Sequence, residues 1–533
     1  MAFVCCSEDI TESYWNEEGT FVARVEVDAA SAISRAYDQE LKWSWESDDV
    51  LLGYQCSGAK TRNQFALVEG SRFRCEEFVY ATQDAAAFHF IYPAAAEQVA
   101  GELTALQQGV WNPLVVATVS NVTVSSIGDV AFESLSAALE VRVWNEDKTT
   151  RRKVVKASLT SSSDFVGKWT LQQDMTYEQS YSGKEITLEG LSSEVVTFNM
   201  PINESGFEAG LMQLTLEDAA GNTTTVSLPA LTYKRGMRTV LNVVFKLPTF
   251  TCATYNVKSS TSGSIGTKIT EDGWDFFSLS EDFSKLASNL SSYTFGTRSR
   301  STSSLWGSGP KDGLGFATLN GRCTFSGEYI DAFDSEYGGL LDGANTVVDK
   351  GFRYYLVTLH DGVEVEVYIT HMNTYDTEKH LECQNAQLQE VATYIANHQS
   401  GRPVIFMGDT NCRYTRNDFE TYFWSILRNA GLSYADAWAE FQWPSAREEL
   451  GLSGDYPELG GKSLMVSDAT GTNAETDIMC STTQNGEVVD KVIYINKPSN
   501  SVQLKAKSYL RDMDYGDLSD HMPIVVEFSY EKQ

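Results

Sequence analysis

A set of polar residues in the second half of the chain shares one placement. Each lies where an apolar stretch that reads as a β-strand begins or ends. The set comprises Asn256 after residues 250–255, Glu281 after 276–280, His371 after 367–370, Asp409 and Asn411 around the end of 404–408, Asp490 before 492–495, and Asp520 with His521 before 523–526. Strand ends are where a rigid scaffold holds reactive groups. We therefore expect these side chains to converge on one cleft at one edge of a pair of sheets.

The residue types suit metal-assisted hydrolysis of a phosphoester. Carboxylate and amide oxygens are the ligands that a hard cation such as Mg²⁺ prefers. The sequence has no cluster of cysteines or histidines at zinc spacing. A histidine beside a carboxylate suits proton transfer, because the carboxylate fixes the tautomer of the imidazole and raises its basicity. The cation would neutralise charge on a phosphate while a histidine–aspartate pair activates water.

Each of these residues, taken alone, also has an ordinary structural explanation. Asp409 would more often be a turn residue, and His371 a hydrogen-bonded residue at a strand end. Asn256 could close a turn, and Ser519-Asp-His521 could cap a loop. The ordered set, rather than any single member, favours a functional site.

In this order the set resembles the endonuclease/exonuclease/phosphatase superfamily, the fold of pancreatic deoxyribonuclease and the bacterial neutral sphingomyelinases. The resemblance covers about residues 249–530 and implies a four-layer α/β sandwich, in which two packed mixed β-sheets are flanked by helices. The matching stretches are Thr254-Tyr-Asn-Val257, Leu279-Ser-Glu-Asp282, Asp312-Gly-Leu-Gly315, Thr370-His371, Gly408-Asp-Thr-Asn411, Asp490-Lys-Val-Ile493 and Ser519-Asp-His521.

The resemblance implies a metal site. Glu281 would be the principal ligand of Mg²⁺, with Mn²⁺ as a possible substitute, and Asn256 and Asp520 would lie close to the metal or the phosphate. One departure from the family pattern is Ser280, which stands where a glutamine usually precedes the glutamate. This departure predicts weaker hydrogen-bonding support for Glu281 without loss of the site.

The resemblance also implies catalytic roles. Asp409 would orient or deprotonate the nucleophilic water, and Asn411 would hold a phosphate oxygen. His371 would stabilise the charge of the transition state. His521, oriented by Asp490, would be the general base or the general acid, and the family differs internally on this division.

Within the superfamily, the sequence favours the sphingomyelinase-type branch. Asp349-Lys-Gly-Phe352 and the Asp312-Gly-Leu segment resemble that branch, in which a Lys-Gly pair precedes a central strand. The apurinic endonuclease branch places a lysine two residues after its glutamate, where this chain has Phe283. The inositol-polyphosphate branch carries a Pro-Ala-Trp-Cys-Asp-Arg-like stretch, which this sequence lacks. A phospholipid at a membrane surface is therefore the favoured substrate.

A long stretch over residues 440–476, rich in glycine, serine, proline and acidic residues, separates Trp438 from the strand that Asp490 begins. Loops of this length inside a domain are usually functional or disordered. Phe441, Trp443 and Tyr456 could contact a lipid headgroup. The alternative, which the residue type favours for Trp443, is that this side chain covers the core of its own domain.

Strands and helices mix after Pro248, as expected of a layered α/β domain. Apolar stretches predict strands over 250–257, 353–359, 363–370, 403–408, 490–496 and 521–528, with an Asp361-Gly362 hairpin turn. Leu381, Leu388, Val391 and Ile395 form one stripe of a helix over 378–398. A second, short helix is predicted over 282–292, with an aspartate at its start.

The first half of the chain reads as all β. Residues 20–27, 140–144 and 212–217 alternate apolar and polar residues, with turn residues between the strands. Many short strands predict β-sandwiches, and a break near Pro113 divides them into residues 1–111 and 112–247, ahead of a catalytic domain over 249–533. Arg35-Ala-Tyr37, Ala87–Pro93 and Gly236–Val244 resemble the fimbrillin-type lipoproteins of Bacteroides-like bacteria, which have two transthyretin-like β-sandwich halves.

Composition limits the class of protein. Over 533 residues the chain carries 41 Lys and Arg against 72 Asp and Glu, a formal charge of −31, which makes nucleic acid a less favoured partner. No apolar run is long enough to span a bilayer. The nine cysteines are odd in number and lack a CxxC pair, unlike a disulfide scaffold.

The start of the chain leaves two readings open. Cys5-Cys6-Ser-Glu-Asp, after a few apolar residues, is similar to the end of a bacterial lipoprotein signal, with Cys5 or Cys6 lipidated. The alternative is a chance cysteine pair near a frayed terminus. With the fimbrillin resemblance, the first reading predicts an exported protein: a surface or periplasmic lipoprotein, or a secreted enzyme.

The sequence as a whole predicts a secreted or lipid-anchored, Mg²⁺-dependent phosphodiesterase that hydrolyses a sphingomyelinase-like phospholipid. One alternative is a non-specific nuclease or another phosphatase of the same fold. Another is a fimbrial or adhesive surface protein with an inactive hydrolase-like domain. The presence of Glu281, Asp409, Asn411, Asp520 and His521 counts against an inactive domain.

Overall fold

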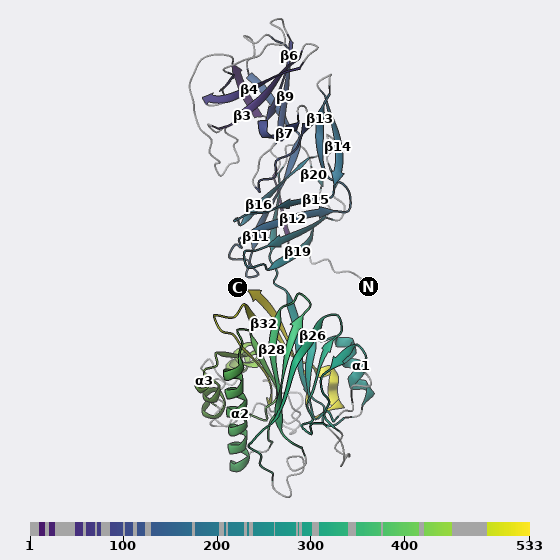
Figure 1. Ribbon diagram of the computed structural model, residues 1–533, viewed down its shortest axis with the longest axis vertical. Helices are drawn as coiled ribbons and strands as arrows, with labels where there is room; N and C mark the ends of the chain where they lie inside the picture. Colours follow the sequence, from purple (N-terminus) through teal and green to yellow (C-terminus); the bar gives the residue numbers. More distant parts are fainter. Residues whose placement is uncertain are drawn as a thin grey trace. The chain divides into compact units, whose positions relative to one another are not determined.

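Strands dominate both halves of the chain, as the alternating residue pattern predicts. The computed structural model has two compact units, residues 1–246 and 247–533 (Figure 1). It describes residues 10–15, 21–26, 48–56, 60–69, 72–75, 86–99, 102–109, 114–122, 129–172, 176–201, 207–208, 212–228, 232–233, 238–260, 262–283, 286, 290–300, 309–338, 348–374, 377–414, 420–449 and 488–533.

The described part of the first unit is built from strands, with one short 3₁₀ turn at Ala94–Ala96. Its strands are β1 (Ile10–Trp15), β2 (Phe21–Glu26), β3 (Val50–Cys56), β4 (Lys60–Glu69), β5 (Arg72–Arg74), β6 (Ala86–Tyr92), β7 (Glu97–Val99), β8 (Glu102–Leu103), β9 (Val115–Val122), β10 (Asp129–Ser134), β11 (Ser136–Trp144), β12 (Lys156–Ser161), β13 (Val166–Leu171), β14 (Tyr177–Gly183), β15 (Glu185–Leu188), β16 (Val195–Pro201), β17 (Phe207–Glu208), β18 (Met212–Glu217), β19 (Thr223–Leu228), β20 (Thr232–Tyr233) and β21 (Arg238–Val244).

These strands form several separate sheets. Their orders are β1-β21-β11-β16, β15-β12-β18-β19, β14-β13-β8-β7 and β17-β20, together with a closed sheet β10-β2-β5-β4-β3-β6-β9. Strands from before and after residue 112 share some of these sheets, since β8 pairs with β13, β6 with β9, and β2 with β10. The division of this unit at residue 112 stays a prediction, and the structure does not show a fimbrillin-like region.

The second unit contains two mixed six-stranded sheets. The first, β24-β25-β23-β22-β33-β32, is formed by β22 (Thr249–Asn256), β23 (Phe276–Ser280), β24 (Tyr293–Phe295), β25 (Gly315–Leu319), β32 (Val502–Arg511) and β33 (Ile524–Lys532). The second, β26-β27-β28-β29-β31-β30, is formed by β26 (Cys323–Ala332), β27 (Gly351–Leu359), β28 (Glu364–His371), β29 (Val404–Asp409), β30 (Tyr434–Asp436) and β31 (Asp490–Ile495).

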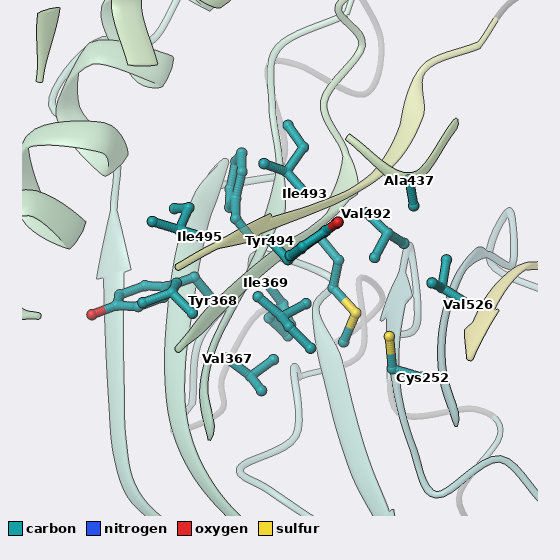
Figure 2. Close-up of a cluster of buried hydrophobic side chains, with 14 of the residues drawn as sticks. Cys252, Val367, Tyr368, Ile369, Ala437, Val492, Ile493, Tyr494, Ile495 and Val526 are labelled. Carbon is teal, nitrogen blue, oxygen red and sulfur yellow. The ribbon is translucent and has the colours of Figure 1, made fainter. Parts of the chain in front are cut away.

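One hydrophobic core joins these two sheets. It includes Cys252 and Val526 from the first sheet and Val367, Ile369 and Val492 from the second. Figure 2 shows these side chains gathered between the strands that carry them. Each buried side chain of this kind stabilises the fold by about 1.5–3 kcal/mol. The core therefore fixes how the inner faces of the two sheets pack against each other.

Helices accompany the sheets of the second unit. They are α1 (Gly263–Asp272), α2 (Glu378–His398), α3 (Ser425–Asn429), α4 (Ala437–Phe441) and α5 (Trp443–Glu449), with a π-helical turn at Glu420–Trp424 and a 3₁₀ turn at Met513–Leu518. In Figure 1, α2 and α3 lie on one side of the sheets and α1 on the other. The arrangement is consistent with a multi-sheet α/β sandwich, while the four-layer order stays a prediction.

Two helix predictions had different outcomes. The helix predicted over 378–398 is confirmed as α2, although its buried face includes His380, Cys383 and Gln384 and leaves Leu381 only half-buried. The helix predicted over 282–292 falls partly outside the described residues. Those that are described there form no helix. The side chain of Asp282 accepts from Leu286 N at 3.4 Å, four residues on, whereas a helix-capping aspartate bonds the N–H two or three residues on.

Of the two roles considered for Trp443, a lipid contact and a core side chain, the structure shows the second. Trp443 is 1% exposed, and its ring lies 6.4 Å from that of Trp438, which is equally buried. Phe441, by contrast, is 36% exposed. Tyr456 lies outside the described residues. The indole of Trp443 is therefore part of the core and not a contact for a lipid headgroup.

Candidate active site

The topology of the two sheets brings the ends of their central strands to one edge. β28 and β29 are parallel, so their last residues, His371 and Asp409, are register partners. β31 is antiparallel to β29, which places its first residue, Asp490, opposite Asp409. In the other sheet β22 is parallel to β23 and antiparallel to β33. The end of β22 at Asn256 therefore lies beside the end of β23 and near the start of β33.

Asp409 lies at the centre of the site. Its Oδ2 accepts a hydrogen bond from Asn256 Nδ2 at 2.9 Å, which links the two sheets directly. The same oxygen lies 3.6 Å from His371 Nε2 and 3.8 Å from His521 Nε2. Burial raises the pKa of Asp409, but the two histidines and the bond from Asn256 outweigh burial and lower it. Asp409 is therefore a carboxylate at neutral pH.

His521 is held by Asp490. The distance from His521 Nδ1 to Asp490 Oδ2 is 2.7 Å, and Asp490 is fully buried. Burial disfavours the charged imidazolium, but the charge and hydrogen bond of Asp490 and the charge of Asp409 outweigh it and raise the pKa of His521 to about 10. The ring is therefore a positively charged imidazolium at neutral pH, with a proton on each nitrogen, and its Nε2 lies on the side of Asp409.

His371 contacts a buried lysine that sequence patterns did not predict as a site residue. Lys350 is 4% exposed, and its Nζ lies 2.6 Å from His371 Nε2. Burial lowers the pKa of Lys350 to about 8, although the charges of Asp409 and Glu281 act in the opposite direction. Burial and the charge of Lys350 lower the pKa of His371 to about 3. The signal in the sequence was the Lys-Gly pair ahead of β27, which indicated only a family branch.

The two nitrogens of the neutral His371 ring have different surroundings. Because Nε2 accepts from the Lys350 ammonium, the ring proton lies on Nδ1. Among the described residues, Nδ1 has no hydrogen-bond partner although it is buried. Nε2, which lies 2.6 Å from Lys350 Nζ and 3.6 Å from Asp409 Oδ2, is therefore the ring nitrogen that lies beside the other charged groups of the site.

Glu281 and Asn256 lie next to one another across the first sheet. Asn256 Nδ2 lies 3.3 Å from Glu281 Oε1, and Asn256 Oδ1 accepts from the backbone N–H of Lys258. In this orientation the amide of Asn256 bridges the carboxylates of Glu281 and Asp409 through its NH₂ group. Its role as a direct metal ligand therefore stays a proposal.

Asn411 and Asp520 are attached to this group less directly. The backbone N–H of Asn411 donates to Asp409 Oδ1 at 3.0 Å, and its side-chain amide donates to the carbonyl of Met372. Asp520 pairs with Lys258, with 2.8 Å between Oδ2 and Nζ. Its side chain is 39% exposed. Asp520 thus lies toward the solvent side of the site, and its charge contributes to the raised pKa of His521.

The donor set fits a hard divalent cation. Glu281 and Asp409 place carboxylates on either side of one amide group, and oxygen is the ligand atom that Mg²⁺ or Mn²⁺ prefers. In the described part of the chain, Asp409, Asp490 and His521 also offer ligand atoms within 4.8 Å of one another. Since Asp490 is hydrogen-bonded to the ring of His521, we interpret that second set as a proton-transfer group.

Unusual backbone conformations gather at this site. Glu281 (φ 58°), Asn411 (φ 51°), Lys258 (φ 48°) and Ser259 (φ 55°) all adopt the left-handed region. Such conformations are disfavoured for residues with a side chain and persist where the surroundings hold them, often at functional sites. The site is therefore built on backbone that local sequence preferences do not specify.

Gly408→Ala is expected to destabilise the second unit by about 3 kcal/mol. Gly408 has φ +141°, and a Cβ there would lie 2.1 Å from the carbonyl oxygen of Thr370 on the neighbouring strand. Gly401→Ala is the control, because φ is +81° but no atom lies within 4 Å of its Cβ, and it should cost only about 1 kcal/mol. Urea unfolding measures both. Equal destabilisation would contradict the close approach of β28 and β29.

Comparisons with known proteins place the chain near phosphoesterases. No protein-family model matches it. Sphingomyelinases of Mycobacterium bovis and Mycobacterium tuberculosis are 28% identical to it over 223 residues, which is 41% of this chain and 38% of each relative. The match thus spans less than two-fifths of the length of these relatives.

The similar solved structures are of the endonuclease/exonuclease/phosphatase type. D. rerio TDP2, solved with a single-strand DNA product, is 16% identical with a TM-score of 0.35, covering 53% of this chain and 99% of that one. Sphingomyelinase C of Streptomyces griseocarneus is 16% identical with a TM-score of 0.33, covering 52% and 99%. Among the described helices, none is long and apolar enough to cross a membrane.

Proposed function

We propose that the second unit is a divalent-metal-dependent phosphodiesterase. The observation that carries this proposal is the arrangement around Asp409 Oδ2, which lies within 4 Å of both His371 and His521 while Asn256 ties it to Glu281. The sequence match to sphingomyelinases supports a phosphoester hydrolase. Acidic, cationic and imidazole groups at these distances can bind a phosphate, activate water and protonate a leaving group.

Asp409 and His521 divide the proton transfers. Asp409 is ionised, so its carboxylate orients the attacking water and accepts a proton from it. His521 is protonated at neutral pH, so Nε2 donates a proton to the oxygen of the leaving group as the P–O bond breaks. Asp490 keeps the ring of His521 in place through Nδ1.

Lys350 and His371 bind the phosphate. The Lys350 ammonium lies beside His371 and is within electrostatic reach of Asp409 and Glu281. Its positive charge, held beside the ring of His371, would stabilise the negative charge that grows on the phosphate oxygens. Their near-complete burial strengthens this interaction.

Glu281 would hold the cation, with Asp520 and Asn256 close to it. Mg²⁺ is the proposed ion and Mn²⁺ the expected substitute, because both accept oxygen ligands. When bound, such a cation supplies positive charge to the phosphate oxygens. The backbone N–H of Asn411 donates to Asp409, which fixes the position of this residue. Its side-chain amide would donate to a phosphate oxygen of the substrate in place of the carbonyl of Met372.

The proposed substrate is a sphingomyelinase-like phospholipid at a membrane surface. The 28% identity to sphingomyelinases supports this choice, and the charge of −31 weighs against a polyanion such as DNA. We further propose that the protein is exported, either anchored through Cys5 or Cys6 or secreted, and that its first unit is fimbrillin-like. The Cys5-Cys6-Ser-Glu-Asp start motivates the export proposal.

A hydrolysis panel tests the proposed function. The full chain would be assayed with Mg²⁺, with Mn²⁺ and with EDTA on sphingomyelin, phosphatidylcholine, inositol phosphates, plasmid DNA and bis(p-nitrophenyl) phosphate. Metal-dependent release of phosphocholine from sphingomyelin is the expected result. Asp409→Asn is the matched control, since it keeps the size of the side chain and removes the central carboxylate.

The outcomes of the panel separate the alternatives. Nicking of plasmid DNA without lipid hydrolysis would make the protein a nuclease. Hydrolysis of inositol phosphates alone would make it a phosphatase. Equal turnover by wild type and Asp409→Asn on every substrate would contradict catalysis at this site.

Residues 247–533 are expected to hydrolyse bis(p-nitrophenyl) phosphate within about twofold of the full chain. The reason is that this range is a compact unit that contains every residue of the proposed site. Circular dichroism melting would show that the shortened chain folds, and kcat/KM would be compared per folded molecule. A folded but inactive 247–533 would mean that the first unit contributes to the site.

A further inference from the structure

A fully buried ion pair lies in the second unit beside the segment that carries Glu281. Arg353 on β27 has no exposed surface, and Asp312 is 4% exposed. The pair is bidentate, because Nε and Nη2 of Arg353 each lie 2.7 Å from one oxygen of Asp312. Arg353 Nη2 also donates to Ser299 Oγ at 2.9 Å. Apolar side chains of the same volume would stabilise such a core at least as well, so stability alone does not account for the pair.

The ion pair fixes a turn. Asp312 Oδ1 accepts from the backbone N–H of Leu314 at 3.1 Å, which closes Asp312-Gly-Leu314 on itself. Gly313 at its centre has φ +68°, a conformation that suits glycine. The turn is thus tied to β27 through Arg353 and has one defined shape.

The Asp312-Gly-Leu314 turn also holds the backbone around Glu281 in place. The carbonyl of Gly313 accepts from the N–H of Asp282 at 2.8 Å. A Cβ added to Gly313 would lie 3.3 Å from Glu281 Cα and 2.8 Å from the ring of Phe283. On its other side the carbonyl of Glu281 accepts from Ser259 N at 3.1 Å. Glu281 is therefore clamped between two segments.

These two backbone hydrogen bonds are needed to hold Glu281 in its conformation, because its φ is 58°. A glutamate leaves the left-handed region unless its neighbours prevent it. A return to ordinary backbone angles would swing its carboxylate away from Asn256 and so away from Asp409. The geometry of the proposed metal ligand thus depends on a turn about 30 residues further along the chain.

We propose that Asp312 and Arg353 are positioning residues that set the affinity for the divalent cation by holding Gly313 against the backbone of Glu281. This inference rests on the proposed function, since it takes Glu281 as the metal ligand. Neither residue touches the reacting atoms. Their effect reaches the site through the Gly313–Asp282 hydrogen bond.

Direct titration of Mn²⁺ into the full chain tests this inference. Electron paramagnetic resonance of free Mn²⁺ gives the Kd without any assay of turnover. Gly313→Ala and Asp312→Asn should each weaken Mn²⁺ binding by about tenfold, because both loosen the turn that holds Glu281. Arg353→Met should act in the same direction. Melting temperatures recorded alongside show that each variant is folded.

Two controls match the changes made. Gly362→Ala places alanine at φ +84° in the β27–β28 turn, where no atom lies within 4 Å of its Cβ. Arg322→Met removes an ion pair to the buried Asp275, 2.8 Å away, just before β23 and so at the opposite end of that strand from Glu281. Both should keep the Mn²⁺ affinity of the wild type within about twofold, even where stability falls.

The outcomes are distinct. Wild-type affinity in folded Gly313→Ala and Asp312→Asn would overturn the positioning role and leave the proposed function intact. Equal weakening in Arg322→Met would also overturn it, because the effect would then follow general destabilisation. Absence of Mn²⁺ binding by the wild type would overturn the proposed metal dependence, and the positioning role with it. Should Asp312→Asn fail to fold, Gly313→Ala decides.

Discussion

Glu281→Gln is expected to lower kcat/KM for phosphodiester hydrolysis about a thousandfold in saturating Mg²⁺. The change keeps the shape of the side chain and the bond from Asn256 but removes the charge that would hold the cation. A bound cation contributes several kcal/mol to charge stabilisation, and a thousandfold loss corresponds to about 4 kcal/mol. The measurement is steady-state hydrolysis of the best substrate from the panel, with metal concentration varied.

Glu271→Gln is the matched control for this prediction. Glu271 is an exposed residue of α1 in the same unit, so its loss should leave kcat/KM unchanged. EDTA should abolish wild-type activity, and added Mg²⁺ or Mn²⁺ should restore it. Full activity in EDTA, or a Glu281→Gln enzyme as fast as wild type, would exclude the proposed mechanism.

The sequence was a good guide to the central strands of the second unit. The hairpin at Asp361-Gly362 and helix α2 were predicted because their patterns are local: period two, period 3.6 and a turn residue with positive φ. The prediction for β33 was shifted, since the strand begins at Ile524 and not at His521. Helix α1 was missed, because only Ile265, Gly266 and Ile269 of its ten residues are buried, which leaves a weak apolar stripe.

The limits of prediction at the site have a different cause. Strand ends could be placed near one another because sheet register is set by long apolar runs, as the His371–Asp409 and Asp409–Asp490 pairs illustrate. Lys350 could not be predicted as a site residue, because its burial depends on a fold that brings β27 beside β28. The left-handed backbone of Glu281 likewise depends on Gly313, which no local pattern reveals.

His521→Ala is expected to lower kcat about 10²- to 10⁴-fold while changing KM little. A general acid acts on the transition state and contributes that range. Asp490→Asn should lower kcat less, because it keeps the size of the side chain but removes the charge that raises the pKa of His521 to about 10. In the wild type, kcat should fall as pH rises through about 10, because His521 then loses the proton it donates. The His521 variant should lack that limb of the pH–rate profile.

Turnover per folded molecule, measured alongside stability across pH, separates this role from a merely structural one. The folded-state pKa of His521 lies above its usual value of 6.5, so its pairing with Asp490 stabilises the fold fully below about pH 6.5 and is lost as pH rises toward 10. The difference in unfolding free energy between wild type and His521→Ala should therefore shrink over that window. If Ser519-Asp-His521 only caps the last strand, the variant would lose stability in the same way yet keep the kcat of its folded fraction. Measuring kcat per folded molecule at pH 7 decides between the two, because only a proton donor leaves the folded variant slow.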